Sequence, residues 1–272
     1  MKNRLDVLLV EKGYFPSREK AKASIMAGLV FVDGQISDKP GTNVDVDSEI
    51  TVKGDDCPYV SRGGLKLEKA LAVFDIDVNG LTCVDIGAST GGFTDCLLQN
   101  GAVKVYSVDV GYGQLDYKLR IDPRVVCMEK INFRYMKEDD IPEKLDFACA
   151  DVSFISLKHM FPVANMLLKD GAEMACLVKP QFEAGREQVG KNGIIKDEKV
   201  HAEVIAKVMG YARENGLAPI GLSHSPITGG KGNIEFLLHL KKTDDQEYID
   251  KSVEELLTKI DETVGSAHKE LS

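Results

Sequence analysis

Val84-Asp85-Ile86-Gly87-Ala88-Ser89-Thr90-Gly91-Gly92-Phe93 is the stretch that decides the fold class of this chain. An apolar strand leads into a glycine-rich turn and then into a helix, and glycine lets a backbone approach a ligand that any Cβ would exclude. Asp109 closes the next apolar run, where a carboxylate can accept hydrogen bonds from ribose hydroxyls. The expected cofactor loop comprises Gly87, Ala88, Ser89, Gly91, Gly92 and Phe93.

The charge next to this loop indicates the kind of cofactor. Asp85 precedes the first glycine by two residues, and its carboxylate would repel a pyrophosphate at a helix N-terminus but could meet an ammonium group. The loop therefore favours S-adenosylmethionine over a dinucleotide. We predict Asp85, Asp109 and Asp151 as further cofactor-binding residues of a methyltransferase.

Alternating strands and helices follow from residue 65 onward, as in a βα-wound sheet. Strands are expected at 82–86, 104–109, 125–128, 145–150 and 172–178, and helices at about 64–74, 91–100, 156–168 and 197–215. Two further apolar runs, 217–223 and 234–240, are joined by a glycine-rich turn without a crossover helix, so they must be antiparallel. The predicted fold class is α/β, a Rossmann-like class I methyltransferase sheet with an antiparallel last strand.

A smaller α+β domain precedes this sheet. Residues 1–22 contain six Lys or Arg and three acids, a local net charge of +3 in a chain of net charge −9. We predict domains at 1–54 and 65–243, a linker at 55–64 and an amphipathic C-terminal helix within 244–272. The overall charge argues against a protein that coats nucleic acid through bulk charge, and it leaves room for a local basic patch.

Composition limits the other classes of protein. The 272 residues include six cysteines without a CxxC pair, and no apolar run approaches the roughly 20 residues that span a bilayer. The N-terminus lacks the apolar stretch and cleavage site of an export signal. We therefore expect a soluble cytoplasmic protein with no membrane partner and no metal, whose cysteines are small buried hydrophobes.

Four charged residues fall where such a sheet holds its ligands. Asp151 and Lys179 each follow an apolar strand, at the carboxyl ends where open α/β sheets bind ligands. Lys66 opens the first helix of the large domain, and Glu235 begins the final strand. We predict these four residues as the catalytic group.

The N-terminal segment resembles the S4 RNA-binding module. The match lies in Arg4-Leu5-Asp6-Val7-Leu8-Leu9-Val10, Ser17-Arg18-Glu19-Lys20-Ala21 and Gly28-Leu29-Val30-Phe31-Val32-Asp33-Gly34. In that module the second helix and the following hairpin present basic side chains to structured RNA. The resemblance implies an S4-like domain, with Arg4, Arg18, Lys20, Lys22 and the linker residue Arg62 as RNA-binding residues.

The large domain resembles the FtsJ-type ribose 2'-O-methyltransferases, whose Lys-Asp-Lys-Glu tetrad matches Lys66, Asp151, Lys179 and Glu235. Nearly the whole chain resembles the TlyA family, through the motifs at 61–67, 85–95, 150–157 and 178–183. This resemblance implies methylation of ribose 2'-hydroxyls, typically of cytidines, in ribosomal RNA, with ribosomal RNA or ribosomal subunits as partners. Some members of that family carry the label haemolysin.

The chemistry of the reaction agrees with these residue types. A ribose hydroxyl attacks a methyl group well only when a base takes its proton, and Lys179 is the candidate base, with Lys66 as the neighbouring cation. Asp151 and Glu235 would hold the lysines and the hydroxyl in line. The leaving thioether is neutral and the methyl carbon already electrophilic, so this transfer requires no metal.

Three alternatives compete with this interpretation. A base methyltransferase would show an Asn/Asp-Pro-Pro-aromatic stretch or a nucleophilic cysteine after proline, whereas residues 151–154 read Asp-Val-Ser-Phe. A pore-forming haemolysin would need an export signal and membrane-spanning segments. An RNA-binding protein without methyltransferase activity would have no need for both the intact loop and the tetrad.

Overall fold

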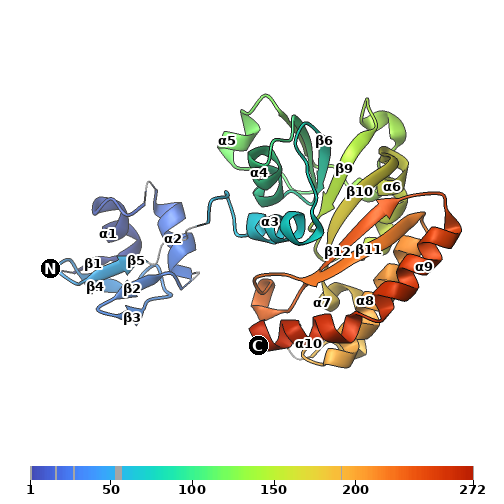
Figure 1. The fold of residues 1–272 in the computed structure, drawn as a ribbon. Coiled ribbons are helices and arrows are strands. Elements are labelled where there is room, and N and C mark those ends of the chain that lie inside the picture. Colours follow the sequence, from blue (N-terminus) through green and yellow to red (C-terminus); the bar gives the residue numbers. More distant parts are fainter. Residues whose placement is uncertain (1, 16, 27, 53–56, 191, 272) are drawn as a thin grey trace. The chain divides into compact units, whose positions relative to one another are not determined.

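The structure is a computed structural model that describes residues 2–15, 17–26, 28–52, 57–190 and 192–271. The chain divides into two compact units, an N-terminal unit Met1–Cys57 and a C-terminal unit Pro58–Ser272 (Figure 1). Residues 53–56, which contain the predicted end of the first domain and the start of the linker, lie outside the described residues.

The N-terminal unit packs two helices against short strands. Its elements are β1 (Lys2–Arg4), α1 (Leu5–Glu11), α2 (Arg18–Met26), β2 (Val30–Val32), β3 (Gln35–Ile36), β4 (Asn43–Asp45) and β5 (Ile50–Val52). The strands form two small sheets, β1-β4 and β3-β2-β5. Leu5, Leu9 and Ile25 are completely buried between helices and strands, so this unit has a hydrophobic core of its own.

The C-terminal unit is built on a seven-stranded sheet of order β11-β12-β10-β9-β6-β7-β8. The strands are β6 (Thr82–Ile86), β7 (Lys104–Asp109), β8 (Val125–Glu129), β9 (Leu145–Ala150), β10 (Leu168–Val178), β11 (Leu217–His224) and β12 (Phe236–Lys242). The first five of these pair in parallel, and β12 is antiparallel to both β10 and β11. The predicted fold class, including the antiparallel last strand, is confirmed.

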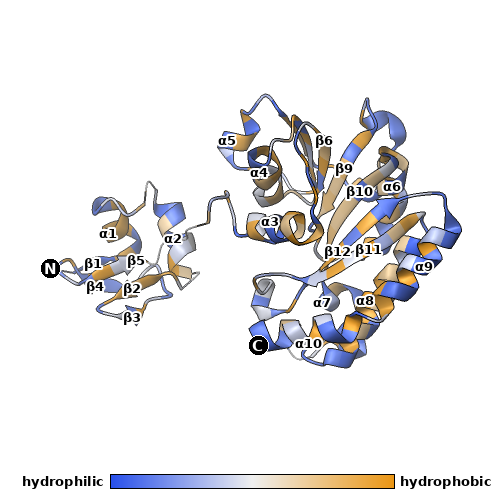
Figure 2. Cartoon of the chain, viewed as in Figure 1, coloured by the Kyte–Doolittle hydropathy of each residue, from blue (hydrophilic) through white to orange (hydrophobic). Residues whose placement is uncertain are grey.

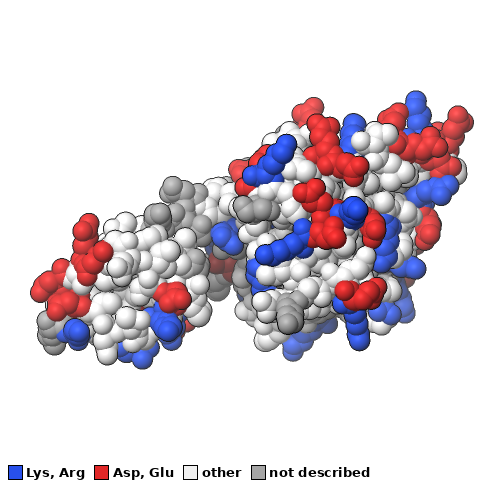
Figure 3. All heavy atoms as spheres, turned by 90° about the horizontal axis from the view of Figure 1, so that it is seen from below, with Lys and Arg blue, Asp and Glu red and all other residues white. Residues whose placement is uncertain are grey.

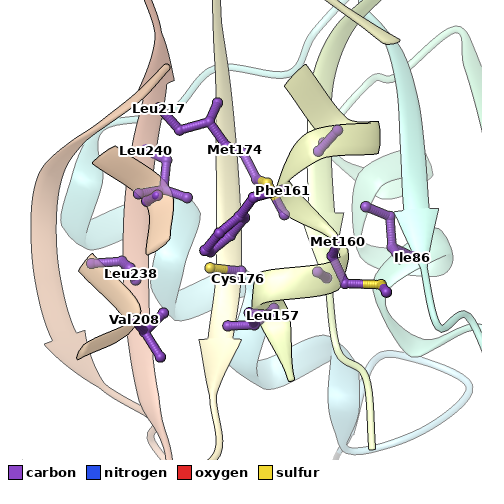
Figure 4. Close-up of a cluster of buried hydrophobic side chains, with 14 of the residues drawn as sticks. Ile86, Leu157, Met160, Phe161, Met174, Cys176, Val208, Leu217, Leu238 and Leu240 are labelled. Carbon is purple, nitrogen blue, oxygen red and sulfur yellow. The ribbon is translucent and has the colours of Figure 1, made fainter. Parts of the chain in front are cut away.

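Helices cover the sheet and bury its apolar side chains. The α-helices are α3 (Gly63–Phe74), α4 (Gly92–Gln99), α5 (Tyr117–Arg120), α6 (Phe161–Leu167), α7 (Pro180–Glu183), α8 (Glu198–Arg213), α9 (Gln246–Leu257) and α10 (Ile260–Leu271). Short 3-10 turns lie at Phe133–Tyr135, Glu138–Asp140, Leu157–His159, Arg186–Gln188 and Gly230–Gly232. Figure 4 shows part of the core, in which Phe161 of α6 and Val208 of α8 lie with Cys176 and Leu238 of the sheet.

Two predicted helices differ from the structure. The segment 156–168 splits into a 3-10 turn and α6, because Pro162 lacks an N–H and so fits only the first turn of an α-helix. The single helix predicted within 244–272 is instead two helices, α9 and α10, that break after Leu257. The break lets each helix bury its own apolar stripe, α9 against β11 and α10 against α8 (Figure 2).

The second half of the predicted linker is part of the C-terminal unit. The Tyr59 hydroxyl donates to Glu68 (2.9 Å), and the Val60 N–H donates to Asp95 (2.8 Å). A Cβ on Gly64 would lie 2.3 Å from the Tyr59 ring, so only glycine permits this packing. The linker prediction is therefore wrong over 58–64, where turn-forming residues serve close packing at the start of α3.

No helix in the described ranges is both long and apolar enough to cross a membrane. No group of three or more His, Cys, Asp or Glu in the same ranges could hold a metal ion.

Candidate active site

Glycines shape the loop after β6. Gly87 has a φ of +87°, and a Cβ there would lie 2.7 Å from the Asp151 carbonyl oxygen. Gly91 has a φ of +95°, and its Cβ would lie 2.3 Å from Leu119. Any side chain at either position would force the loop away from its neighbours, which explains the glycines in the sequence motif.

Asp109, at the carboxyl end of β7, fixes this loop. Its carboxylate accepts hydrogen bonds from the Ser89 N–H (2.8 Å) and from the Gly111 N–H (2.6 Å). A cavity of about 500 Å³ opens beside it, and Gly87, Ser89, Asp109 and Asp151 of the predicted cofactor residues line it. Asp85, Ala88, Gly91, Gly92 and Phe93 do not line this cavity.

Asp85 lies beneath the loop. It is completely buried, and its Oδ2 accepts hydrogen bonds from the Thr94 N–H (2.9 Å) and hydroxyl (2.7 Å) at the start of α4. Burial raises the pKa of this carboxyl to about 7, and its Oδ1 has no hydrogen-bond partner among the described residues. In this structure Asp85 therefore supports the loop from inside, a position that the sequence did not indicate.

The four predicted catalytic residues come together. Lys66 Nζ lies 2.6 Å from Glu235 Oε2 and 3.9 Å from Asp151 Oδ2, while Lys179 forms an ion pair with Asp151 Oδ1. Lys66, Lys179 and Glu235 are at least nine-tenths buried. Asp151 thus stands between the two lysines, and the tetrad carries two positive and two negative groups in one connected cluster.

The ends of elements place these side chains. Lys66 lies in the first turn of α3, and Asp151 follows β9 directly. Lys179 follows β10, and Pro180 then begins α7, which turns the chain away at once. Glu235 lies one residue before β12, so the antiparallel strand brings its carboxylate to the carboxyl ends of the parallel strands.

A second cavity, of about 360 Å³, lies on the other side of the tetrad. Lys66, Lys179 and Glu235 line it, together with Ser153, Phe154, Gln181, Phe182, Gly193, Gly230, Lys231 and Asn233. Ser153 and Phe154 line both cavities, so the tetrad lies where the two adjoin. We refer to the 500 Å³ space as the donor cavity and to the 360 Å³ space as the acceptor cavity.

An aromatic pair forms one wall of the acceptor cavity. Phe154 is 90% exposed, has a φ of +63° and packs on Phe182 with ring centroids 4.8 Å apart. Sequence reasoning missed both residues. The available signal was an aromatic residue three positions after Asp151, the predicted catalytic carboxylate that follows β9.

The predicted RNA-binding residues are mostly at the surface of their units. Arg4, Arg18, Lys20 and Arg62 are exposed, and Lys22 is half-buried. Arg4 (2.9 Å) and Arg18 (2.8 Å) both pair with Asp6, whose side chain is fully buried. Hydrogen bonds from the two guanidinium groups hold the pKa of Asp6 well below its usual range. The two arginines therefore also tie β1 and α2 to α1.

Comparisons with known proteins agree with this geometry. The FtsJ-like methyltransferase family matches residues 59–242, and the S4 domain family matches residues 3–50. The chain is 54% identical to YqxC of Bacillus subtilis, over 99% of this chain and 95% of that protein. It is 42% identical to a Mycobacterium tuberculosis protein named 16S/23S rRNA (cytidine-2'-O)-methyltransferase TlyA, over 93% of this chain and 94% of that one.

A solved structure from Streptococcus thermophilus, titled as a hemolysin, has a TM-score of 0.78 and 51% identity, covering 99% of this chain and 96% of that chain. Matches of this identity and length extend over both units. The resemblance found in the sequence is therefore confirmed, and the chain belongs to the TlyA family, in which an S4 domain precedes an FtsJ-like, S-adenosylmethionine-dependent methyltransferase domain.

Proposed function

We propose that this protein methylates the 2'-hydroxyl of a cytidine ribose in ribosomal RNA. The observation that carries the proposal is the position of the tetrad between two adjoining cavities, one beside the glycine loop and one beside the aromatic pair. A group-transfer enzyme needs this arrangement, because donor and acceptor must meet at the residues that activate them. The relatives named for cytidine 2'-O-methylation support the choice of acceptor.

The donor cavity fits S-adenosylmethionine. Gly87 lets the loop pack closely against Asp151 at the cavity wall, and the Asp109 carboxylate lies at the same wall, where ribose hydroxyls could donate to it. When bound, this cofactor supplies an electrophilic methyl group on a cationic sulfur. Asp151 lines the same cavity, so its negative charge would lie near the cationic sulfur of a bound cofactor.

The tetrad would activate the acceptor. In our proposal Lys179 first releases a proton and then accepts the proton of the 2'-hydroxyl at Nζ, while the 2'-oxygen bonds to the methyl carbon and the bond from that carbon to sulfur breaks. Asp151 holds Lys179, and Glu235 holds Lys66, so each lysine has a carboxylate that fixes its position. Exclusion of water around these buried side chains strengthens their electrostatic interactions.

The acceptor cavity suits a nucleotide. Phe154 presents an exposed aromatic face next to the tetrad, and bases in single-stranded or splayed RNA stack on such faces. We infer that the base of the target nucleotide packs here while its ribose reaches Lys179. The S4 domain of the N-terminal unit supports an RNA partner, and we propose that the protein works on ribosomal RNA or ribosomal subunits in the cytoplasm.

The decisive test separates cofactor binding from methyl transfer. Lys179→Met keeps an apolar stem of similar length and removes the amine. We expect this variant to bind S-adenosylmethionine by calorimetry with wild-type affinity, and to transfer less than about a tenth of the wild-type tritiated methyl to ribosomal RNA. Turnover above that level would mean that the amine lowers the activation barrier by less than about 1.4 kcal/mol, and that another group is the base.

Asp109→Ala is the matched control, because it changes the donor cavity and leaves the tetrad intact. Loss of its hydrogen bonds to Ser89 and Gly111 should weaken cofactor binding by about 1 to 3 kcal/mol. Mass mapping of ribose methylation on ribosomal RNA, from cells with and without this protein, then identifies the modified nucleotide.

A further inference from the structure

The acceptor cavity contains a cation that the tetrad does not use. Lys66 and Lys179 are buried and paired with carboxylates, whereas Lys231 lines the same cavity and is exposed. Lys231 has no hydrogen bond or ion pair with any residue in the part of the chain that the structure describes. Its charge is therefore available to a ligand that enters the cavity.

The backbone around Lys231 is held in place. Lys231 has a φ of +60° and ψ of 13° within the 3-10 turn Gly230–Gly232, and the Gly229 N–H donates to the Asn233 carbonyl (2.8 Å). A Cβ on Gly229 would lie 1.9 Å from Glu235 Oε1, so the turn rests directly against the tetrad. The position of Lys231 is thus tied to that of a catalytic carboxylate.

Asn233 braces this turn against a second loop. It is 3% exposed, and its amide nitrogen donates to the carbonyls of Gly193 (2.9 Å) and Gly230 (3.2 Å). Its Oδ1 accepts from the Ile195 N–H (3.1 Å). Lys231 Nζ lies 3.8 Å from the position that a Cβ on Gly193 would occupy. The lysine side chain therefore extends across the rim of the acceptor cavity toward the loop that contains Gly193.

The chemistry of RNA supplies the matching anion. A ribose whose 2'-hydroxyl lies at the tetrad carries a phosphate on its neighbouring 3'-oxygen and another on its 5' side. Base edges offer only partial charges, whereas each phosphate carries a full negative charge that lysine binds strongly as a point charge.

We propose that Lys231 binds a backbone phosphate next to the target ribose, so that the cavity selects a 2'-hydroxyl within an RNA chain over that of a free nucleoside. This inference rests on the proposed function. The braced glycine turn sets the distance between the lysine and the tetrad, and the phosphate contact places the ribose before the methyl transfer. Lys231 is accordingly a binding residue, and it takes no part in the proton transfer.

The test measures RNA binding and turnover over a range of salt concentrations. Lys231→Gln and Lys231→Arg are compared with wild type on unmethylated ribosomal RNA. The control is Lys104→Gln, which changes a half-buried lysine, paired with Glu143, at the amino end of β7, whereas the tetrad lies at the carboxyl ends of the parallel strands. We expect Lys231→Gln to lower the slope of log affinity against log salt by roughly 0.7 to 0.9 and to raise KM roughly fivefold, with kcat and cofactor affinity unchanged.

Lys231→Arg, which keeps the positive charge, should restore both the slope and KM. The proposal is overturned if Lys231→Gln behaves like Lys104→Gln, or if it lowers kcat at unchanged KM. Failure of the proposed function would look different, because the wild-type protein itself would then transfer no methyl group to RNA at any salt concentration.

Discussion

At the scale of single residues, the absence of a Cβ decides much of the active site. Gly87 and Gly229 both lie where a side chain would collide with a tetrad residue, Asp151 in the first case and Glu235 in the second. At Gly230, next to Gly229, a Cβ would have no atom of the described residues within 4 Å. Adjacent glycines in one turn therefore have different physical roles.

This difference predicts the effects of two alanine substitutions. Gly229→Ala should displace the Glu235 carboxylate from Lys66 and lower turnover by at least about tenfold, equivalent to about 1.4 kcal/mol of barrier. Gly230→Ala should retain nearly full turnover, and both variants should bind the cofactor normally because neither glycine lines the donor cavity. Methyl-transfer assays and calorimetry check this. Equal turnover in the two variants would show that Glu235 tolerates the displacement.

At the scale of elements, the contact between α8 and α10 contains a pair of histidines. His201 of α8 is completely buried, and its Nδ1 lies 2.9 Å from His268 Nε2 of α10. Asp197 and Glu198 at the start of α8 are the acidic groups near this pair, and the His201 ring packs edge-on against Phe236 of β12. Ionisation of His201 would therefore disturb the contact that fastens the C-terminal helix.

The stability of the protein should consequently depend on pH. Burial, reinforced by His268, lowers the pKa of His201 to about 4 from the 6.5 of an unperturbed histidine. Because the pKa of His201 is lower in the folded state, the folded protein favours the neutral imidazole. The stability that depends on this neutral form is present above about pH 6.5 and is lost as pH falls toward 4. Urea unfolding should show a loss of about 2 kcal/mol between about pH 7 and about pH 5. His201→Gln should reduce that loss, and an unchanged pH dependence in this variant would exclude His201 as its source.

The sequence predicts the sheet well because its central strands are buried on both faces and therefore appear as continuous apolar runs. The tetrad was predictable for a related reason, since Asp151 and Lys179 directly follow such runs. The roles proposed for Phe154 and Lys231 could not be predicted from the sequence, because loops that are far apart in the chain form the acceptor cavity. The direction of a side chain also could not be predicted from the sequence. The charge pattern predicts that Asp85 faces the cofactor, whereas in the structure Asp85 supports the loop from below.

At the scale of the whole molecule, each unit has a hydrophobic core of its own, around Leu5 and Ile25 in one and around the seven-stranded sheet in the other. Lys, Arg, Asp and Glu are interspersed over the larger unit in the view of Figure 3, in keeping with the net charge of −9. Bulk charge therefore gives little attraction for RNA, and affinity depends on local groups. We propose that the basic residues near the N-terminus are such groups.

A protein of residues 58–272 should accordingly fold and bind S-adenosylmethionine with an affinity within about twofold of the full chain, because the described residues that line the donor cavity all belong to the C-terminal unit. Its affinity for ribosomal RNA should fall. The slope of log affinity against log salt should also become shallower, by roughly 0.7 to 0.9 for each phosphate that the N-terminal unit would otherwise neutralise. Calorimetry with the cofactor and salt-titrated RNA binding give the two readouts independently, and circular dichroism controls for folding. If the shortened protein methylates intact ribosomal RNA as well as the full chain does, the N-terminal unit does not supply RNA affinity, and Arg4 and Arg18 serve only to neutralise the buried Asp6.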